Sequence, residues 1–267
     1  MRLLEIIAPG EFRLTRDIAN NIEPYAILSH TWGKDEEEVS FRDLENRSRQ
    51  QKIGYEKIRL CGEQAARDGL RYFWVDTCCI DKSSSAELTE AINSMFNWYQ
   101  KASRCYVYLA DVPAADYGGN DPSSEMWETA FLKSRWFTRG WTLQELVAPD
   151  VVEFFSQEWK WLGNKSSLAG QIRDACGVPV ETLREQGLSS FSINERMQWA
   201  ANRTTTRPED KAYSLLGIFG VYMPLLYGEG ELPAFSRLRR EIDAFLGSSD
   251  ASEDREGISF ADFHLLR

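Results

Sequence analysis

A tryptophan and a glutamate stand four positions apart in the run from Arg139 to Leu146, RGWTLQEL. The apolar residues Leu143 and Leu146 predict that this run is helical, and in a helix Trp141 and Glu145 share one face, a turn apart. An aromatic plane beside a carboxylate suits a sugar or a nucleotide. These two residues are therefore the first candidates for chemistry.

The residues just before this run support a second interpretation. Positions 131–138 carry further aromatic rings together with Lys133 and Arg135. An ordinary buried aromatic core explains the same pattern, with Arg135 and Arg139 lying over the rings and Glu145 as their ion-pair partner. The local pattern leaves both interpretations open.

Composition restricts the class of protein. The chain has 267 residues, of which 43% are hydrophobic and 12% aromatic, and this is typical of one large or two small globular domains. Its net charge of −10 argues against a nucleic-acid partner, because a phosphate-binding surface needs an excess of basic residues.

The cysteines and the hydropathy pattern indicate the compartment. Five cysteines, with Cys78 and Cys79 adjacent, show no metal-ligand spacing with His30 or His264, so no metal site is predicted. The first apolar run is broken by Glu5, and no apolar run is long enough to span a membrane. We expect a soluble cytoplasmic protein with reduced thiols that does not bind membranes.

Strands and helices alternate through the first 160 residues. Helical spacing of apolar residues follows Gly54 and again Ser85. Short apolar runs between these helices predict four buried strands, at positions 25–29, 72–75, 105–109 and 151–155. This pattern predicts an α/β fold with a mostly parallel sheet flanked by helices, in which ligands bind beyond the carboxyl ends of the strands.

Polar residues at these strand ends are the candidate binding residues. Ser29, His30 and Trp32 end or follow the first strand, and Asp76 ends the second. Three of them have a structural alternative: Ser29 as a turn hydroxyl, His30 as a hydrogen-bonded imidazole, Asp76 as a cap of the following turn. The acidic stretch 34–38 that follows is predicted to be a solvated loop.

The adjacent cysteines raise a different chemistry. Cys78 or Cys79 with His30 as base could form a cysteine-hydrolase pair, which needs an accessible thiolate within hydrogen-bonding reach of the imidazole. Cysteine more often serves as a small buried apolar residue, and the sequence favours that role.

The last third of the chain is predicted to be helical. Helices are expected at positions 195–201, 210–219 and 232–245, with a rigid connection at 223–230. Arginines and threonines at 203–207 could bind phosphate at a helix start, but a structural role is favoured.

We therefore divide the chain into three parts. An α/β core spans residues 1–160, a helical extension of the same domain spans 161–246, and an acidic flexible tail spans 247–267. Residues 111–124 are predicted to be a surface excursion within the core.

Several blocks of sequence resemble the HET domain, the fungal heterokaryon-incompatibility module. They lie at positions 25–33, 73–82, 134–146, 203–219 and 224–230. The resemblance implies an effector of programmed cell death in fungal innate immunity. It also implies assembly into homo-oligomers on activation and a nucleotide-binding receptor as a fused or separate partner.

The order of strands and the helix with Trp141 and Glu145 are also similar to TIR domains, whose flavodoxin-like sheet can cleave NAD at its nicotinamide ribose. In that family the required glutamate lies on the helix after the third strand, and Glu145 matches it. The resemblance implies an NAD hydrolase with Glu145 as catalytic residue and NAD as substrate rather than cofactor.

One carboxylate can suffice for this chemistry. Nicotinamide leaves as a neutral base, so no general acid is needed, and Glu145 would stabilise the developing oxocarbenium charge. Trp141 or Trp32 would stack a base, and Arg139 or Arg135 would meet the pyrophosphate.

A non-enzymatic module that oligomerises and recruits partners is the alternative function. The two functions differ in what Glu145 does. For the enzyme we expect Glu145→Gln to abolish turnover without unfolding the chain, on the assumption that the carboxylate is at least half exposed.

Overall fold

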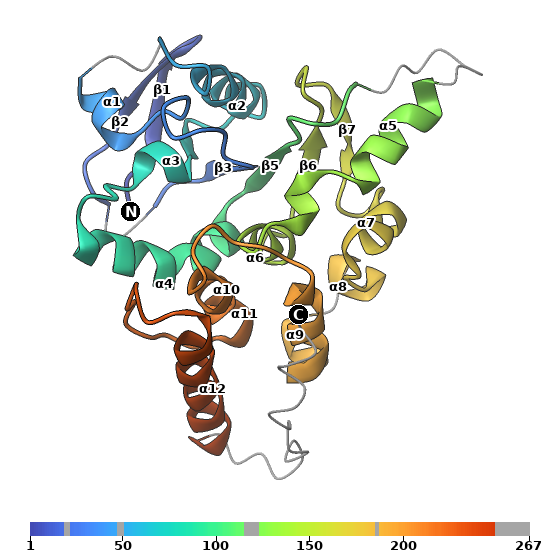
Figure 1. Ribbon diagram of the computed structural model, residues 1–267. Helices are drawn as coiled ribbons and strands as arrows, with labels where there is room; N and C mark the ends of the chain where they lie inside the picture. Colours follow the sequence, from blue (N-terminus) through green and yellow to red (C-terminus); the bar gives the residue numbers. More distant parts are fainter. Residues whose placement is uncertain (19–21, 47–50, 115–122, 185–186, 249–267) are drawn as a thin grey trace.

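A seven-stranded sheet forms the centre of the molecule, with strands in the order β2-β1-β4-β3-β5-β6-β7 (Figure 1). The computed structural model describes residues 1–18, 22–46, 51–114, 123–184 and 187–248. The predicted tail beyond residue 248 and most of the predicted excursion at 111–124 lie outside these residues.

The four predicted strands are confirmed and form the parallel centre of this sheet. They are β3 (Tyr25–His30), β4 (Tyr72–Trp74), β5 (Arg104–Tyr108) and β6 (Val152–Phe155). In the register, Ile27 of β3 lies between Trp74 and Cys105. All six residues of β3 are buried, as expected for a strand covered on both faces.

Three further strands are antiparallel and were not predicted. They are β1 (Leu4–Ala8), β2 (Glu11–Leu14) and β7 (Trp161–Asn164). β1 and β2 form a hairpin around Gly10, whose φ of 73° favours glycine, and β1 also pairs with β4. β7 pairs with β6. The sheet is therefore mixed, and the prediction of a mostly parallel sheet holds only for its centre.

Helices cover both faces of the parallel strands (Figure 1). On one side lies α2 (Tyr55–Arg67), and on the other lie α4 (Ser85–Lys101) and α6 (Thr142–Val147). Ser84 caps α4 by accepting a hydrogen bond from the backbone of Glu87. The shorter helices of this region are α1 (Phe41–Glu45), α3 (Asp76–Cys79), α5 (Ser123–Leu132) and η2 (Arg135–Thr138).

The rest of the described chain is mainly helical. It comprises α7 (Ala169–Cys176), α8 (Val180–Arg184), η3 (Leu188–Ser190), α9 (Ile193–Ala201), α10 (Asp210–Tyr213), α11 (Leu216–Phe219) and α12 (Glu231–Ser248). The helix predicted at 210–219 is split into α10 and α11. Buried residues of α12 join the same hydrophobic core as the sheet, so these helices pack onto it.

Candidate functional site

Glu145 lies beneath the carboxyl end of β3. It occupies the first turn of α6, where 7% of its surface is exposed. The hydroxyl of Ser29 donates a hydrogen bond to Glu145 Oε2, and the indole of Trp136 donates to Ser29 Oγ at 2.8 Å. These contacts fix the carboxyl in one orientation.

The surroundings of Glu145 favour its protonated form. Burial raises the pKa of Glu145 to about 8, and the negative charge of Asp76 acts in the same direction. Hydrogen bonds from Ser29 and Tyr99 and the charge of Arg139 only partly oppose this shift. The carboxyl is therefore mostly neutral at pH 7.

The expectation of an exposed or half-exposed Glu145 was wrong. The interior face of α6 packs against β3 and α4, and this face includes Glu145 together with its apolar neighbours. The ion-pair interpretation is not supported either, because among the described residues Glu145 forms no ion pair with a guanidinium, and Arg135 instead lies 3.7 Å from Asp111.

The backbone of Trp141 is in the helical region, so the predicted sharing of one helix face with Glu145 stays a prediction. Trp141 immediately precedes α6 and is half-buried. Burial raises the pKa of Asp210, and a hydrogen bond from Trp141 partly opposes that rise. Trp136 holds Ser29. Sequence analysis did not assign Trp136 to the site, and its place in the aromatic run 131–138 was the available signal.

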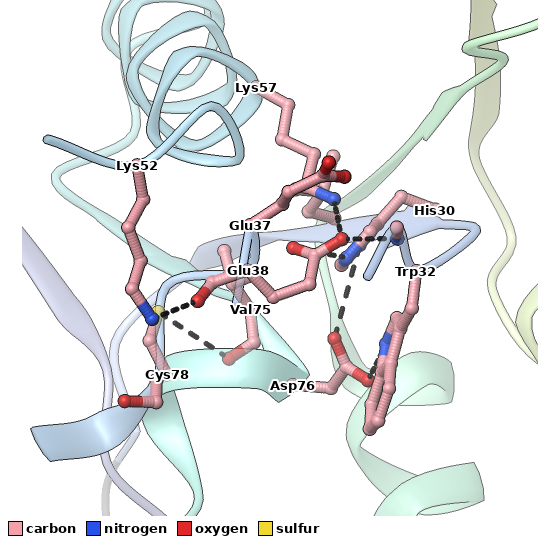
Figure 2. A network of polar contacts seen from close by, with 12 residues as sticks. His30, Trp32, Glu37, Glu38, Lys52, Lys57, Val75, Asp76 and Cys78 are labelled. Atoms are coloured by element: carbon pink, nitrogen blue, oxygen red, sulfur yellow. Dashed lines mark hydrogen bonds and ion pairs between the residues drawn. The ribbon is translucent and has the colours of Figure 1, made fainter. Parts of the chain in front are cut away.

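His30 follows Ser29 in β3, so its side chain points to the opposite face of the sheet. Figure 2 shows His30 between two carboxylates, with Nε2 3.9 Å from Glu38 Oε2 and Nδ1 3.9 Å from Asp76 Oδ1. Burial, together with the charges of Lys57 and Lys82, lowers the pKa of His30 well below its usual range. The imidazole is therefore neutral at pH 7.

Glu38 fastens the loop after β3 to α2 (Figure 2). Its Oε1 accepts hydrogen bonds from Lys57 Nζ and from the backbone of Gly33, each at 2.6 Å. Its carbonyl accepts from Lys52 Nζ at 2.8 Å. The prediction of a solvated loop at 34–38 was wrong for Glu38, which is 7% exposed, and no periodic pattern singled it out.

Trp32 and Asp76 form the accessible part of this group. The indole Nε1 of Trp32 donates to Asp76 Oδ2 at 2.8 Å, and Lys82 Nζ lies 3.6 Å from the centre of its ring. Trp32 is 40% exposed. Because Asp76 also raises the Glu145 pKa, it links the two groups electrostatically across the end of the sheet.

The structure does not support the cysteine-hydrolase hypothesis, because neither of the adjacent cysteines is accessible. Cys78 and Cys79 are buried, and burial together with Cys79 raises the pKa of Cys78 well above its usual range. Cys78 Sγ lies 3.9 Å from the carbonyl of Val75. In the part of the chain that the structure describes, no group of three or more His, Cys, Asp or Glu side chains could hold a metal ion, and no helix could cross a membrane.

Residues of the block at 203–207 contact the start of α6 and the segment just before it. Arg203 is 5% exposed and donates to the carbonyl of Arg139 and to Thr142 Oγ1, each at 2.9 Å. The backbone of Thr204 pairs with that of Thr138 and Gly140. This arrangement agrees with the structural role favoured from the sequence.

Comparison with known proteins gives two matches. Residues 25–129 match a family model described as heterokaryon incompatibility protein (HET). The chain is 54% identical over 276 residues to vegetative incompatibility protein HET-E-1 of Podospora anserina, an alignment that covers 100% of this chain. The chain spans 20% of the length of that relative. No solved structure matches.

Proposed function

Because the chain belongs to the heterokaryon-incompatibility (HET) family, we propose that it is a fungal cell-death effector of vegetative incompatibility that cleaves NAD between nicotinamide and ribose. The name of the relative HET-E-1 concerns vegetative incompatibility. The proposal extends that process to this chain and adds a mechanism.

The position of Glu145 carries the proposal. The parallel strands are ordered β4-β3-β5-β6, which corresponds to the first four strands of the flavodoxin-like order 2-1-3-4-5. In that order ligands bind at the carboxyl ends of the strands, where the strand order reverses. Glu145 is bonded to Ser29 near that end of β3, and it lies on α6, which follows α5 and η2 between the third and fourth parallel strands.

The chemistry follows from one carboxylate. The bond between the ribose carbon and the pyridinium nitrogen breaks, its electron pair goes to neutral nicotinamide, and the ribose becomes an oxocarbenium ion. Ionised Glu145 stabilises that positive charge, and water then adds to the carbon and releases a proton. The cationic ring of bound NAD lowers the pKa of Glu145 and so favours the ionised form.

Access to Glu145 requires movement, because only 7% of the residue is exposed. We assign this movement to the assembly of several copies of the chain on activation, driven by a fused or separate nucleotide-binding receptor. Protein that is dilute and monomeric would then turn over slowly, and concentration or crosslinking would raise the rate.

The test is release of nicotinamide by the purified chain, both dilute and crosslinked. Glu145→Gln is expected to lower the rate at least about 100-fold, the size of effect seen when a group that stabilises transition-state charge is removed. The rate of the unaltered chain should rise with pH through about 8, as Glu145 ionises. The matched control is Glu128→Gln, at an exposed position of α5.

No release from the crosslinked chain would overturn the enzymatic proposal. The buried, mostly neutral carboxyl of Glu145 favours the second candidate in that case, a non-enzymatic module that oligomerises and recruits partners. In such a module Glu145→Gln would leave cell death intact.

A further inference from the structure

Trp32 presents a fixed aromatic surface at the end of the sheet. The residue is 40% exposed, its Nε1 is bonded to Asp76, and Lys82 Nζ lies over one face of the ring, 3.6 Å from its centre. A ring that is already immobilised loses little conformational freedom when a planar ligand stacks on it. This surface therefore suits a nucleobase.

Buried polar atoms beside Trp32 lack hydrogen-bond partners among the described residues. They are His30 Nε2, Glu38 Oε2 and Asp76 Oδ1. The side chain of His30 is 1% exposed, and its two ring nitrogens face the two carboxylates. Unpaired buried polar groups are rare, and each needs an explanation.

The geometry around His30 indicates which ligand would pair with these atoms. The two carboxylates face opposite nitrogens of the ring, so one metal ion cannot bind both of them and the imidazole together. Carboxylate oxygens need hydrogen-bond donors, and a ribose offers two adjacent hydroxyls. Asp76, whose side chain is 19% exposed, is the carboxylate that a ligand can reach.

Lys82 adds a positive charge beside the ring. The ammonium group is compact and well suited to a phosphate, and it sits close to the ring on which a base would stack. Base, ribose hydroxyls and phosphate thus each have a partner within one group of side chains.

We infer that Trp32, Asp76 and Lys82 form a subsite for a purine nucleoside 5′-monophosphate, the half of NAD that does not react. Trp32 stacks the base, the exposed side of the Asp76 carboxylate accepts a ribose hydroxyl, and Lys82 binds the phosphate. His30 and Glu38 are positioning residues that hold Asp76 and the loop after β3. The inference rests on the proposed NAD substrate.

The test is binding of AMP to the unaltered chain, because AMP lacks the nicotinamide–ribose bond and so reports binding apart from turnover. The readout is the indole N–H resonance of Trp32, one of nine tryptophans, identified by its loss in Trp32→Phe. AMP is compared with 2′,3′-dideoxy-AMP, adenosine and inorganic phosphate. Trp161→Phe, which alters a tryptophan that is 47% exposed on β7, is the matched control.

AMP is expected to shift the Trp32 resonance saturably. Removing both hydroxyls from the ligand, or changing Asp76→Asn, should weaken binding at least tenfold. Lys82→Met should weaken AMP but not adenosine, and Trp161→Phe should bind AMP normally. The comparison of AMP with 2′,3′-dideoxy-AMP changes the ligand and not the protein. It therefore tests the role of the ribose hydroxyls even if the Asp76→Asn variant does not fold.

Three results would overturn the subsite: no saturable shift, equal affinity for dideoxy-AMP, or the same shift with phosphate alone. Its failure is distinct from that of the proposed function. AMP binding without nicotinamide release refutes only NAD cleavage, whereas release without AMP binding at Trp32 refutes only the subsite.

Discussion

At the scale of single residues, the proton on Glu145 links stability to function. The carboxyl is buried beside Ser29, and its pKa of about 8 lies well above the value of 4.5 for an unperturbed glutamate. Ionisation thus costs folding free energy, and a bound cation recovers part of that cost. The charge of Glu145 therefore depends on whether a cation occupies the site.

The stability of the chain should therefore depend on pH through Glu145. The folded pKa is raised, so the stabilisation is complete below about pH 4.5 and is lost as pH rises through about 8. Relative to Glu145→Gln, the free energy of unfolding of the unaltered chain should fall by at most about 1.4 kcal/mol per pH unit over this window. Urea unfolding of both chains from pH 4 to 9 measures the difference.

The control for this experiment is Glu128→Gln, whose stability should parallel that of the unaltered chain at every pH. A constant difference between the unaltered chain and Glu145→Gln across the window would show that Glu145 is not titrating in the folded protein.

At the scale of elements, close packing of helices holds the C-terminal part against the core. α11 packs against α4, and a Cβ built on Gly217 would meet Phe96 Cβ at 2.0 Å. α4 also contacts α6, the helix of Glu145. The packing of α11 thus bears on the position of the site through α4.

Gly217→Ala should destabilise the protein, because the added methyl group forces α4 and α11 apart. We expect a loss of about 1–3 kcal/mol, the usual cost of overpacking a core. The matched control is Gly170→Ala in α7, where a Cβ has nothing within 4 Å and replacing a helical glycine should stabilise by about 0.5–1 kcal/mol. Thermal unfolding of both variants measures these changes in stability. Equal unfolding temperatures for Gly217→Ala and Gly170→Ala would contradict the close packing of α11 against α4.

The antiparallel strands at the two ends of the sheet, β2 with β1 and β7, show where element prediction failed. β1 is a short apolar run interrupted by Glu5, and β7 contains Gly163 at a φ of 155°. These antiparallel strands carry a weaker apolar pattern because part of each one is exposed. The four central strands, covered on both faces, were predictable for the opposite reason.

At the scale of the whole molecule, the C-terminal helices and the site are one structure. Arg203 reaches across the chain to the carbonyl of Arg139 and the hydroxyl of Thr142, at the start of α6. The helix that bears Glu145 is therefore anchored by a segment about 60 positions later in the sequence.

Arg203→Ala should loosen the start of α6. The carbonyl of Arg139 and the hydroxyl of Thr142 would each lose a charged donor, which costs about 2–3 kcal/mol. Amide hydrogen exchange at residues 142–147 should accelerate, while Arg240→Ala on the exposed face of α12 should leave it unchanged. Unchanged exchange in Arg203→Ala would mean that α6 is held by its own packing alone.

The sequence by itself determined the family and the central strands. The HET resemblance is confirmed. The apolar runs that predicted the four parallel strands are local features of the chain. Helix starts such as that of α2 after Gly54 were likewise readable, because turn residues and apolar spacing act over a few positions.

Only the tertiary structure decided the state of the candidate residues. Ser29 and Glu145 stand 116 positions apart, and their contact, the burial of the carboxyl and its raised pKa arise from elements that meet only on folding. Strand alternation likewise separates Ser29 from His30, although they are neighbours in the sequence. A pKa depends on burial and on nearby charge, and neither is a property of local sequence.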